Sequence, residues 1–380
     1  MQDDQVSGSP PQAGFVPPPY PYDRLDDLKA VADAHPGGSV DLSIGTPVDP
    51  PPAGVIQALS HSGLERGYPP SIGTIELRQA VSRWLGRRLD VAVDPARVGA
   101  CVGTKEFVAT LPQWLRLRRP DRDTVLYPEI AYPTYEMGAI LAGCRAVPVP
   151  VDESWRIDLS AIQESDAQRA LCLWVNTPGN PAGGLDDLDS AAAWGRAHDV
   201  PVFSDECYVE FTWQGRRRTI LSSGTSGVVA VHSLSKRSNF AGGRVGFYVG
   251  DEELVHYLQE VRKHVGMMVP GPAQAAGAAA LDDDAHVELQ RQRYRSRLGR
   301  LGEVLAKWSG IDIPMPAGGF YLWFPVDDAW DFTERLVRDS GALLSPGEFY
   351  GPGGTGYVRA AVVQPDEQID RVAHRLGIDS

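Results

Sequence analysis

The chain has 380 residues, of which 43% are apolar and 22% charged, as in ordinary globular proteins. This length exceeds one ordinary core, so we expect either two domains or one large domain with a smaller partner. The formal net charge of −13 argues against a nucleic-acid-binding protein, and no apolar run reaches the roughly 20 residues that a membrane span needs.

The N-terminal segment MQDDQVSGSP is acidic and polar, without the apolar region of a secretory signal. Four cysteines, at positions 101, 144, 172 and 207, lie in or beside apolar runs and show no metal-binding spacing. They predict buried thiols in a reducing compartment, so we expect a cytoplasmic protein without a metal site.

The first element in chain order is a loosely held arm over residues 1–22, because its stretch PPPYPY cannot be helical. A helix is predicted over 23–35, ended by Pro36 and two glycines. From about 70 to 280, helical patterns alternate with seven apolar runs: VGACVG, TVLYP, RAVPVPV, RALCLWVN, VPVFSDE, VVAVHS and VGFYVG. This alternation predicts an α/β fold, with a mostly parallel seven-stranded sheet between helices.

After residue 280 the pattern changes. A long charged helix over 282–308 precedes two alternating strands, GGFYLWFPV and YVRAAVV, with a helix between them. We therefore predict a smaller α+β domain formed by residues 281–380 together with the arm and helix of residues 1–45. Residues 46–280 would form the large domain.

Polar side chains follow five of the predicted strands, where open α/β sheets bind ligands. A lysine in a partly desolvated site can attack a carbonyl, so Lys236 can bond covalently to the aldehyde of pyridoxal phosphate. Asp205 can pair with the pyridine nitrogen, and Asn180 and Tyr208 with the ring hydroxyl. The remaining candidates are Thr104, Lys105, Ser233, Ser235 and Arg244 for the phosphate, and Tyr132 for stacking on the ring.

Most of these residues have an ordinary structural explanation when taken singly. Asp205 and Asn180 can be turn formers, the tyrosines can be core aromatics, and Lys105 can be a solvated helix residue. Lys236 is the exception, since it lies in a predicted loop that is rich in small residues and hydroxyls between two apolar strands. It is their occurrence together, in this order, that favours a cofactor site.

Several motifs resemble those of class I/II aminotransferases, which are fold-type I pyridoxal-phosphate enzymes. The matching stretches are GYPPSIGTIELRQAV, NTPGNPAGG, SDECY and SLSKRSNFAGGRVG, and the likeness runs from about residue 41 to 361. The resemblance implies that Lys236, Asp205 and Tyr208 are catalytic. It also implies that Arg359, Gly45 and Asn180 bind the substrate carboxylate. Tyr68 would reach the phosphate of a neighbouring subunit, so the resemblance implies a homodimer with shared active sites.

A narrower likeness is to succinyldiaminopimelate aminotransferases of the actinobacterial type, carried by GTPVDPP, GTKEFVATLP, AYPTYEMGA and FYGPGG. It implies transfer of an amino group between glutamate and N-succinyl-2-amino-6-oxopimelate in lysine biosynthesis. Such a substrate calls for a distal cation, for which Lys263, His264 and Arg24 are candidates. Met267 and Met268 would line the site from the partner subunit.

Other functions remain open. The same scaffold serves aminotransferases for other amino acids and C–S β-lyases, which would keep Lys236 and Asp205. A transcriptional regulator would need a DNA-binding domain, but only about 40 proline-rich residues precede SIGTPVDP. A nucleotide-dependent dehydrogenase is disfavoured because no GxGxxG motif follows a strand and opens a helix.

Overall fold

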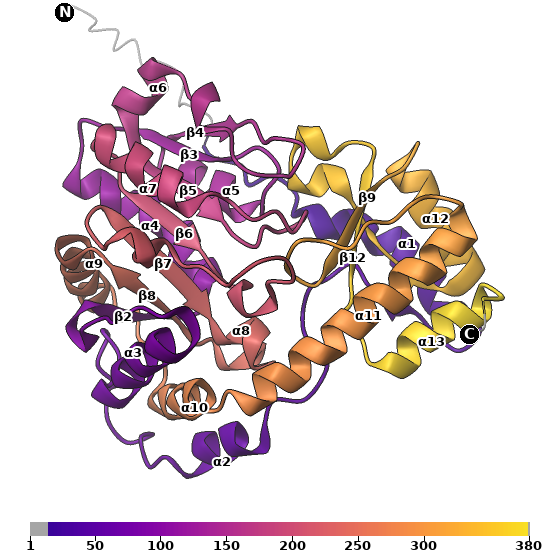
Figure 1. The fold of residues 1–380 in the computed structure, drawn as a ribbon, viewed down its shortest axis with the longest axis horizontal. Coiled ribbons are helices and arrows are strands. Elements are labelled where there is room, and N and C mark those ends of the chain that lie inside the picture. Colours follow the sequence, from indigo (N-terminus) through magenta and orange to yellow (C-terminus); the bar gives the residue numbers. More distant parts are fainter. Residues whose placement is uncertain (1–13, 379–380) are drawn as a thin grey trace, which may run out of the picture.

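The computed structural model describes residues 14–378, and its largest element is a seven-stranded sheet (Figure 1). The strand order is β2-β8-β7-β6-β5-β3-β4, in which β8 runs antiparallel to both neighbours and the other pairs are parallel. The strands are β2 (Val98–Cys101), β3 (Thr124–Pro128), β4 (Arg145–Val149), β5 (Ala170–Asn176), β6 (Val202–Asp205), β7 (Val228–Ser233) and β8 (Gly246–Gly250). All seven predicted strands and the mostly parallel sheet are confirmed.

Helices cover both faces of this sheet, which explains the continuous apolar runs in its strands. In β7, Val228 and Ala230 pack toward one layer of helices, and Val229 and Val231 toward the other. The first layer contains α3 (Ile75–Leu89), α7 (Leu188–Ala197) and α10 (Gly271–Asp282). The second contains α4 (Thr104–Arg118), α5 (Thr134–Leu141) and α9 (Glu252–His264). Short helices α2 (Ala53–His61), α6 (Glu164–Arg169) and α8 (Leu234–Arg237) complete this part of the chain.

A second, smaller core lies beside the large sheet. It contains an antiparallel sheet in the order β11-β12-β9, formed by Ser345–Pro346, Tyr357–Ala361 and Tyr321–Pro325. Helices α11 (Ala285–Ser309), α12 (Ala329–Ser340) and α13 (Asp366–Arg375) belong to the same C-terminal region. Figure 1 shows α11 running from the region of α10 toward this smaller part.

The N-terminal region packs against C-terminal elements. Strand β1 (Val40–Asp41) pairs in parallel with β10 (Ala342–Leu343), and α1 (Asp26–Asp33) contacts α12. The predicted helix over 23–35 is divided, because a 3₁₀ turn over Pro21–Leu25 precedes α1. The start of the predicted arm, residues 1–13, lies outside the described residues. The predicted domain boundaries at 45/46 and 280/281 stay predictions.

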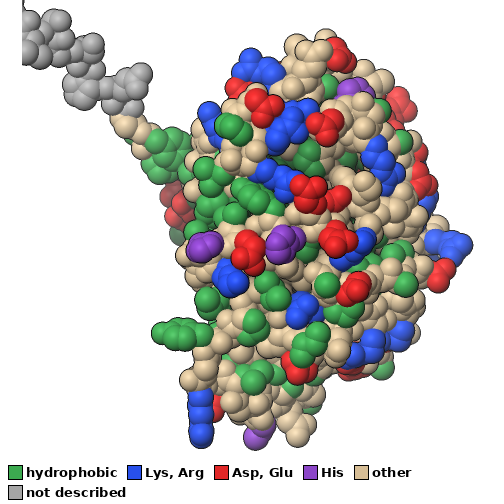
Figure 2. All heavy atoms as spheres, turned by 90° about the vertical axis from the view of Figure 1, so that its left-hand side faces the viewer, with side chains coloured by type: hydrophobic (Ala, Val, Ile, Leu, Met, Phe, Trp, Pro, Cys, Tyr) green, Lys and Arg blue, Asp and Glu red, His purple; other side chains and the backbone are tan. Residues whose placement is uncertain are grey.

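The surface that Figure 2 presents mixes acidic and basic side chains, with no patch of a single sign. None of the helices between residues 14 and 378 has the length and apolar character needed to span a membrane.

Candidate active site

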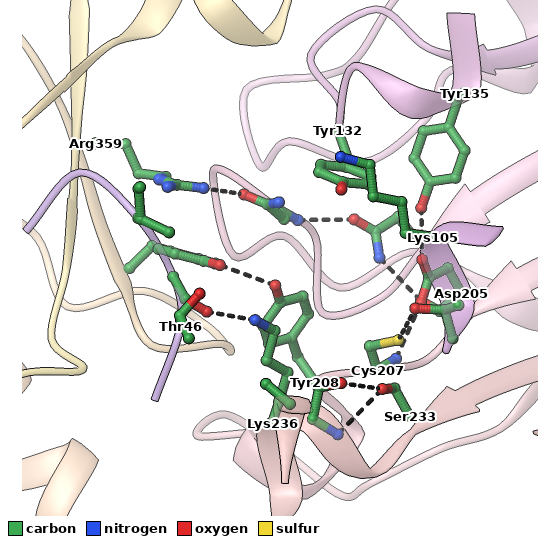
Figure 3. A pocket seen from close by; sticks show the side chains of 18 of the residues that line it. Thr46, Lys105, Tyr132, Tyr135, Asp205, Cys207, Tyr208, Ser233, Lys236 and Arg359 are labelled. Carbon is green, nitrogen blue, oxygen red and sulfur yellow. Dashed lines mark hydrogen bonds between the residues drawn. The ribbon is translucent and has the colours of Figure 1, made fainter. Parts of the chain in front are cut away.

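A cavity of about 460 Å³ opens at the carboxyl edge of the large sheet, where ligands of α/β proteins bind. It is lined by twelve of the thirteen predicted site residues: Gly45, Thr104, Lys105, Tyr132, Asn180, Asp205, Tyr208, Ser233, Ser235, Lys236, Arg244 and Arg359. Figure 3 shows side chains from the large sheet on one side of this cavity and Arg359 on the other. The fold thus brings distant parts of the chain to one cavity.

One end of the cavity is built to receive an anion. Thr104 is the first residue of α4, a helix of 15 residues whose N-terminus presents free backbone N–H groups. Gly103 precedes it with φ +73°, and a Cβ at Gly103 would lie 2.1 Å from Nη2 of Arg244. Glycine is therefore needed for Arg244 to lie over the start of this helix. The hydroxyls of Ser233 and Ser235, 2.9 Å apart, lie on the same cavity wall.

Lys236 lies between the two ends of the cavity. The sequence suggested a loop here, but the structure places Lys236 in the single-turn helix α8, directly after β7. This turn forms because Ser233 caps it, accepting a hydrogen bond from the Ser235 N–H at 3.1 Å. The Lys236 Nζ donates to the backbone oxygen of Gly45. Burial lowers the pKa of Lys236 to about 8, so the neutral, nucleophilic amine is accessible near neutral pH.

Asp205 ends β6 with its side chain 7% exposed. Its Oδ2 accepts a hydrogen bond from the Tyr135 hydroxyl at 2.9 Å, and its Oδ1 accepts one from the Cys207 N–H at 3.2 Å. Burial raises the pKa of Asp205, while these donors and Lys236 act in the opposite direction. The side-chain amide of Asn176 donates to the Asp205 backbone oxygen at 2.9 Å. The carboxylate is thus held from both sides within the cavity wall.

Arg359 lies at the opposite end and is only 1% exposed. Its guanidinium lies 4.1 Å from the ring centre of Tyr321 and 4.7 Å from that of Tyr350. Nη1 donates to Oδ1 of Asn180 at 2.8 Å, and Nη2 donates to the backbone oxygen of Ser43. Among residues 14–378 it has no carboxylate partner, and its Nε has no hydrogen-bond partner. A buried cation in this state is suited to bind an incoming carboxylate.

Two further predicted site residues have clear packing partners. The Tyr208 hydroxyl lies 2.8 Å from that of Tyr321, so it is positioned by the smaller core. A Cβ at Gly45 would fall 2.1 Å from the Tyr321 hydroxyl, which explains why this backbone segment has glycine. Both residues therefore link the cavity to the ring that stacks on Arg359.

Several residues that line the cavity were not predicted from the sequence. These residues are Tyr20, Tyr22, Ile44, Thr46, Tyr135, Asn176, Cys207, Ala241 and Tyr321. Two had a usable signal: Asn176 ends a predicted strand, and Tyr135 follows Tyr132 by three residues after another predicted strand. Tyr321 had none, because it is one of several aromatic residues in an alternating strand.

Some candidate residues lie away from the cavity lining of this chain. Tyr68 is 98% exposed. Arg24 pairs with Glu348 at 2.6 Å, and Lys263 with Glu260 at 3.5 Å. The others outside the lining are His264, Met267 and Met268. In residues 14–378 no cluster of three or more His, Cys, Asp or Glu side chains could hold a metal ion.

Comparison with known protein families identifies the family of this chain. Residues 38–376 match the family described as aminotransferase class I and II. The chain is a class I/II aminotransferase. Such enzymes depend on pyridoxal phosphate, so the aminotransferase is a pyridoxal-phosphate enzyme of fold-type I.

The matches to individual relatives cover nearly the whole length of the aminotransferase. The 4-dedimethylamino-4-oxo-anhydrotetracycline transaminase OxyQ of Streptomyces rimosus is 42% identical, covering 94% of this chain and 99% of that protein. The LL-diaminopimelate aminotransferase of Aquifex aeolicus is 35% identical, covering 95% and 96%. The solved structure of a probable N-succinyldiaminopimelate aminotransferase from Thermus thermophilus is 30% identical. It covers 94% of this chain and 100% of its own, with a TM-score of 0.84.

The residues of the aminotransferase fit its cofactor. The α4 N-terminus, two hydroxyls and Arg244 form an anion-binding end, which suits the phosphate. The buried Asp205 carboxylate suits a protonated pyridine nitrogen, and Lys236 between them suits the aldehyde carbon. The donor set thus matches the charges of pyridoxal phosphate group by group.

Proposed function

We propose that this aminotransferase exchanges an amino group between glutamate and N-succinyl-2-amino-6-oxopimelate, on the route to diaminopimelate and lysine. The observation that carries the amino-acid reaction is Arg359, a buried guanidinium without a carboxylate partner among residues 14–378, in the same cavity as Lys236 and Asp205. The choice of a diaminopimelate precursor is supported by the names of two relatives, from Aquifex aeolicus and Thermus thermophilus.

In this proposal the cofactor is held at both ends. Thr104, Lys105, Ser233, Ser235 and Arg244 bind its phosphate. Asp205 pairs with the pyridine nitrogen, Asn180 and Tyr208 with the ring hydroxyl, and Tyr132 stacks on the ring face. Asn180 then has two tasks, because its Oδ1 already accepts from Arg359.

Lys236 is the group that moves a proton. Bound pyridoxal phosphate supplies an electron sink for the electrons released when the substrate Cα–H bond breaks. The Lys236 amine, with its pKa near 8, is basic enough to take that proton and acidic enough to return it. The hydrogen bond from Nζ to the Gly45 carbonyl keeps the amine between the two ends of the cavity.

The substrate carboxylate binds to Arg359. Its Nε has no partner among the described residues, so it remains available as a donor. Flanking rings of Tyr321 and Tyr350 restrict the guanidinium plane, which fixes the direction from which the carboxylate approaches. Gly45 leaves room for the backbone to approach this carboxylate.

We further propose that the aminotransferase is a homodimer with shared active sites. We also propose that it is a cytoplasmic protein. Tyr68 is an almost fully exposed aromatic residue in a single chain, which is typical of a side chain that contacts a partner. In the dimer it reaches the phosphate in the other subunit, and Met267 and Met268 contribute to that subunit's substrate wall.

A second candidate is transfer of an amino group to a ketone of a fused-ring compound. It is favoured by the 42% identity to the Streptomyces rimosus transaminase, which extends over 99% of that protein. Aromatic and apolar side chains at the cavity, among them Tyr20, Tyr22 and Ile44, suit a planar ligand.

The test is an absorption titration of purified protein saturated with pyridoxal phosphate. Glutamate should abolish the visible band of the lysine-bound cofactor, and the correct oxo compound should restore it. Restoration by N-succinyl-2-amino-6-oxopimelate supports the proposal, whereas restoration only by a fused-ring ketone supports the second candidate. Release of pyruvate and ammonia from cystathionine without an oxo acid would indicate a C–S lyase. No visible band at all would refute the role of Lys236.

A further inference from the structure

Tyr135 is a fully buried hydroxyl that no predicted role uses. It lies on α5, is 1% exposed, and donates to Oδ2 of Asp205 at 2.9 Å. Figure 3 shows its hydroxyl directed at the Asp205 carboxylate. Oδ1 accepts from the Cys207 N–H at 3.2 Å, and the Cys207 thiol also interacts with this carboxylate. Tyr135 supplies the hydroxyl donor to Oδ2.

The position of the Tyr135 ring is tightly determined. It packs against Trp174 at 5.2 Å and meets Tyr132 edge-on at 6.3 Å between ring centres. Trp174 itself is fully buried in β5, the strand next to β6. A rigid ring therefore delivers the hydroxyl to one place, and the same ring touches the residue proposed to stack on the cofactor.

Few other ionisable groups act on Asp205. Besides Tyr135, the Cys207 thiol favours the charged carboxylate through a hydrogen bond, and Lys236 favours it through its positive charge. Burial raises the pKa of Asp205 and thereby opposes the charged form that a pyridinium partner requires. The hydrogen bond donated by the Tyr135 hydroxyl acts with those of Cys207 to favour the charged form.

We propose that Tyr135 is a positioning residue that keeps Asp205 ionised and aligned with the pyridine nitrogen. This inference rests on the proposed role of Asp205. Without the phenol donor the carboxylate becomes more basic, and the proton moves from the ring nitrogen to the carboxyl oxygen. The ring then withdraws electrons less strongly, so breakage of the substrate Cα–H bond slows.

The experiment is nitrogen-15 NMR of Tyr135→Phe loaded with pyridoxal phosphate that is labelled at the ring nitrogen. Phenylalanine keeps the packing on Trp174 and removes only the donor. We expect the resonance to move toward the unprotonated position and kcat to fall about tenfold to a hundredfold, the size of a lost hydrogen bond to a charged group. Tyr257→Phe is the matched control, since it removes a phenol bond to the Trp114 backbone oxygen away from the cavity.

Asp205→Asn separates failure of this inference from failure of the proposed function. If Asp205→Asn moves the resonance and Tyr135→Phe does not, Tyr135 has no such role, while that of Asp205 stands. If Asp205→Asn also leaves the resonance unchanged, the proposed role of Asp205 fails and this inference with it. A fluorinated tyrosine at position 135, a stronger donor of the same shape, should move the resonance the opposite way from phenylalanine. The direction of this shift tests the inference even if Tyr135→Phe does not fold.

Discussion

Arg359→Lys tests the substrate end of the cavity most directly. Lysine keeps the positive charge but replaces a planar fork of donors by a single ammonium group. It cannot stack between the Tyr321 and Tyr350 rings, which lie 4.1 Å and 4.7 Å from the guanidinium. The substitution therefore removes geometry and leaves charge.

The expected loss follows from the hydrogen bonds. A guanidinium can hold a carboxylate through two parallel bonds, and one such bond to a charged group contributes about 1.5–3 kcal/mol. Loss of one bond should lower kcat/KM for glutamate by roughly 10- to 150-fold, because each 1.36 kcal/mol is about tenfold. The dissociation constant of pyridoxal phosphate should stay within about twofold, since Arg359 lies at the other end of the cavity.

The assay is steady-state kinetics with glutamate, together with cofactor titration of the apoprotein. Arg375→Lys is the matched control, because Arg375 also donates to backbone oxygens, those of Gly38 and Ser340, but lies outside the cavity lining. An unchanged kcat/KM in Arg359→Lys, or a loss that is explained entirely by weaker cofactor binding, would refute the carboxylate role.

Three other predictions follow from pKa shifts and exposure. Covalent uptake of pyridoxal phosphate by the apoprotein should speed up as pH rises through about 8, where Lys236 loses its proton. Stopped-flow rates measured against pH would contradict this if their midpoint lay near the pKa of free lysine. Burial raises the pKa of Glu206 to about 8 and lowers that of His232 to about 3. Between pH 6.5 and 8 the folded chain thus holds more protons than the unfolded chain, and its free energy of unfolding falls as pH rises. Urea titrations should show that the free energy of unfolding falls less over this pH range in Glu206→Gln than in the unmodified protein. An identical fall in both would show that Glu206 is not the cause. Tyr68→Ala should weaken cofactor binding measurably in the dimer, even though this side chain is 98% exposed in one chain; equal affinities would remove Tyr68 from the site.

Much of the molecule could be predicted from local patterns. The seven apolar runs became the seven strands because an all-buried strand such as β5 needs a continuous apolar sequence. The polar residues after β5, β6 and β7 could be assigned to one edge, since parallel strands end on the same side. Lys236, Asp205 and Asn180 were found in this way, although α8 replaced the expected loop.

Other features depend on contacts between residues far apart in the chain. Arg359 reaches the cavity only because β12 pairs with β9 and β11, and its partners Asn180 and Ser43 are 179 and 316 residues away. Tyr135 meets Asp205 across 70 residues, and Tyr208 meets Tyr321 across 113. The periodicity of apolar residues indicates which face of a helix or strand is buried, but it does not indicate which polar atoms form hydrogen bonds with one another there. The residue types at the strand ends were therefore determined by the sequence alone, whereas the hydrogen bonds that fix their charge and direction were decided by tertiary packing.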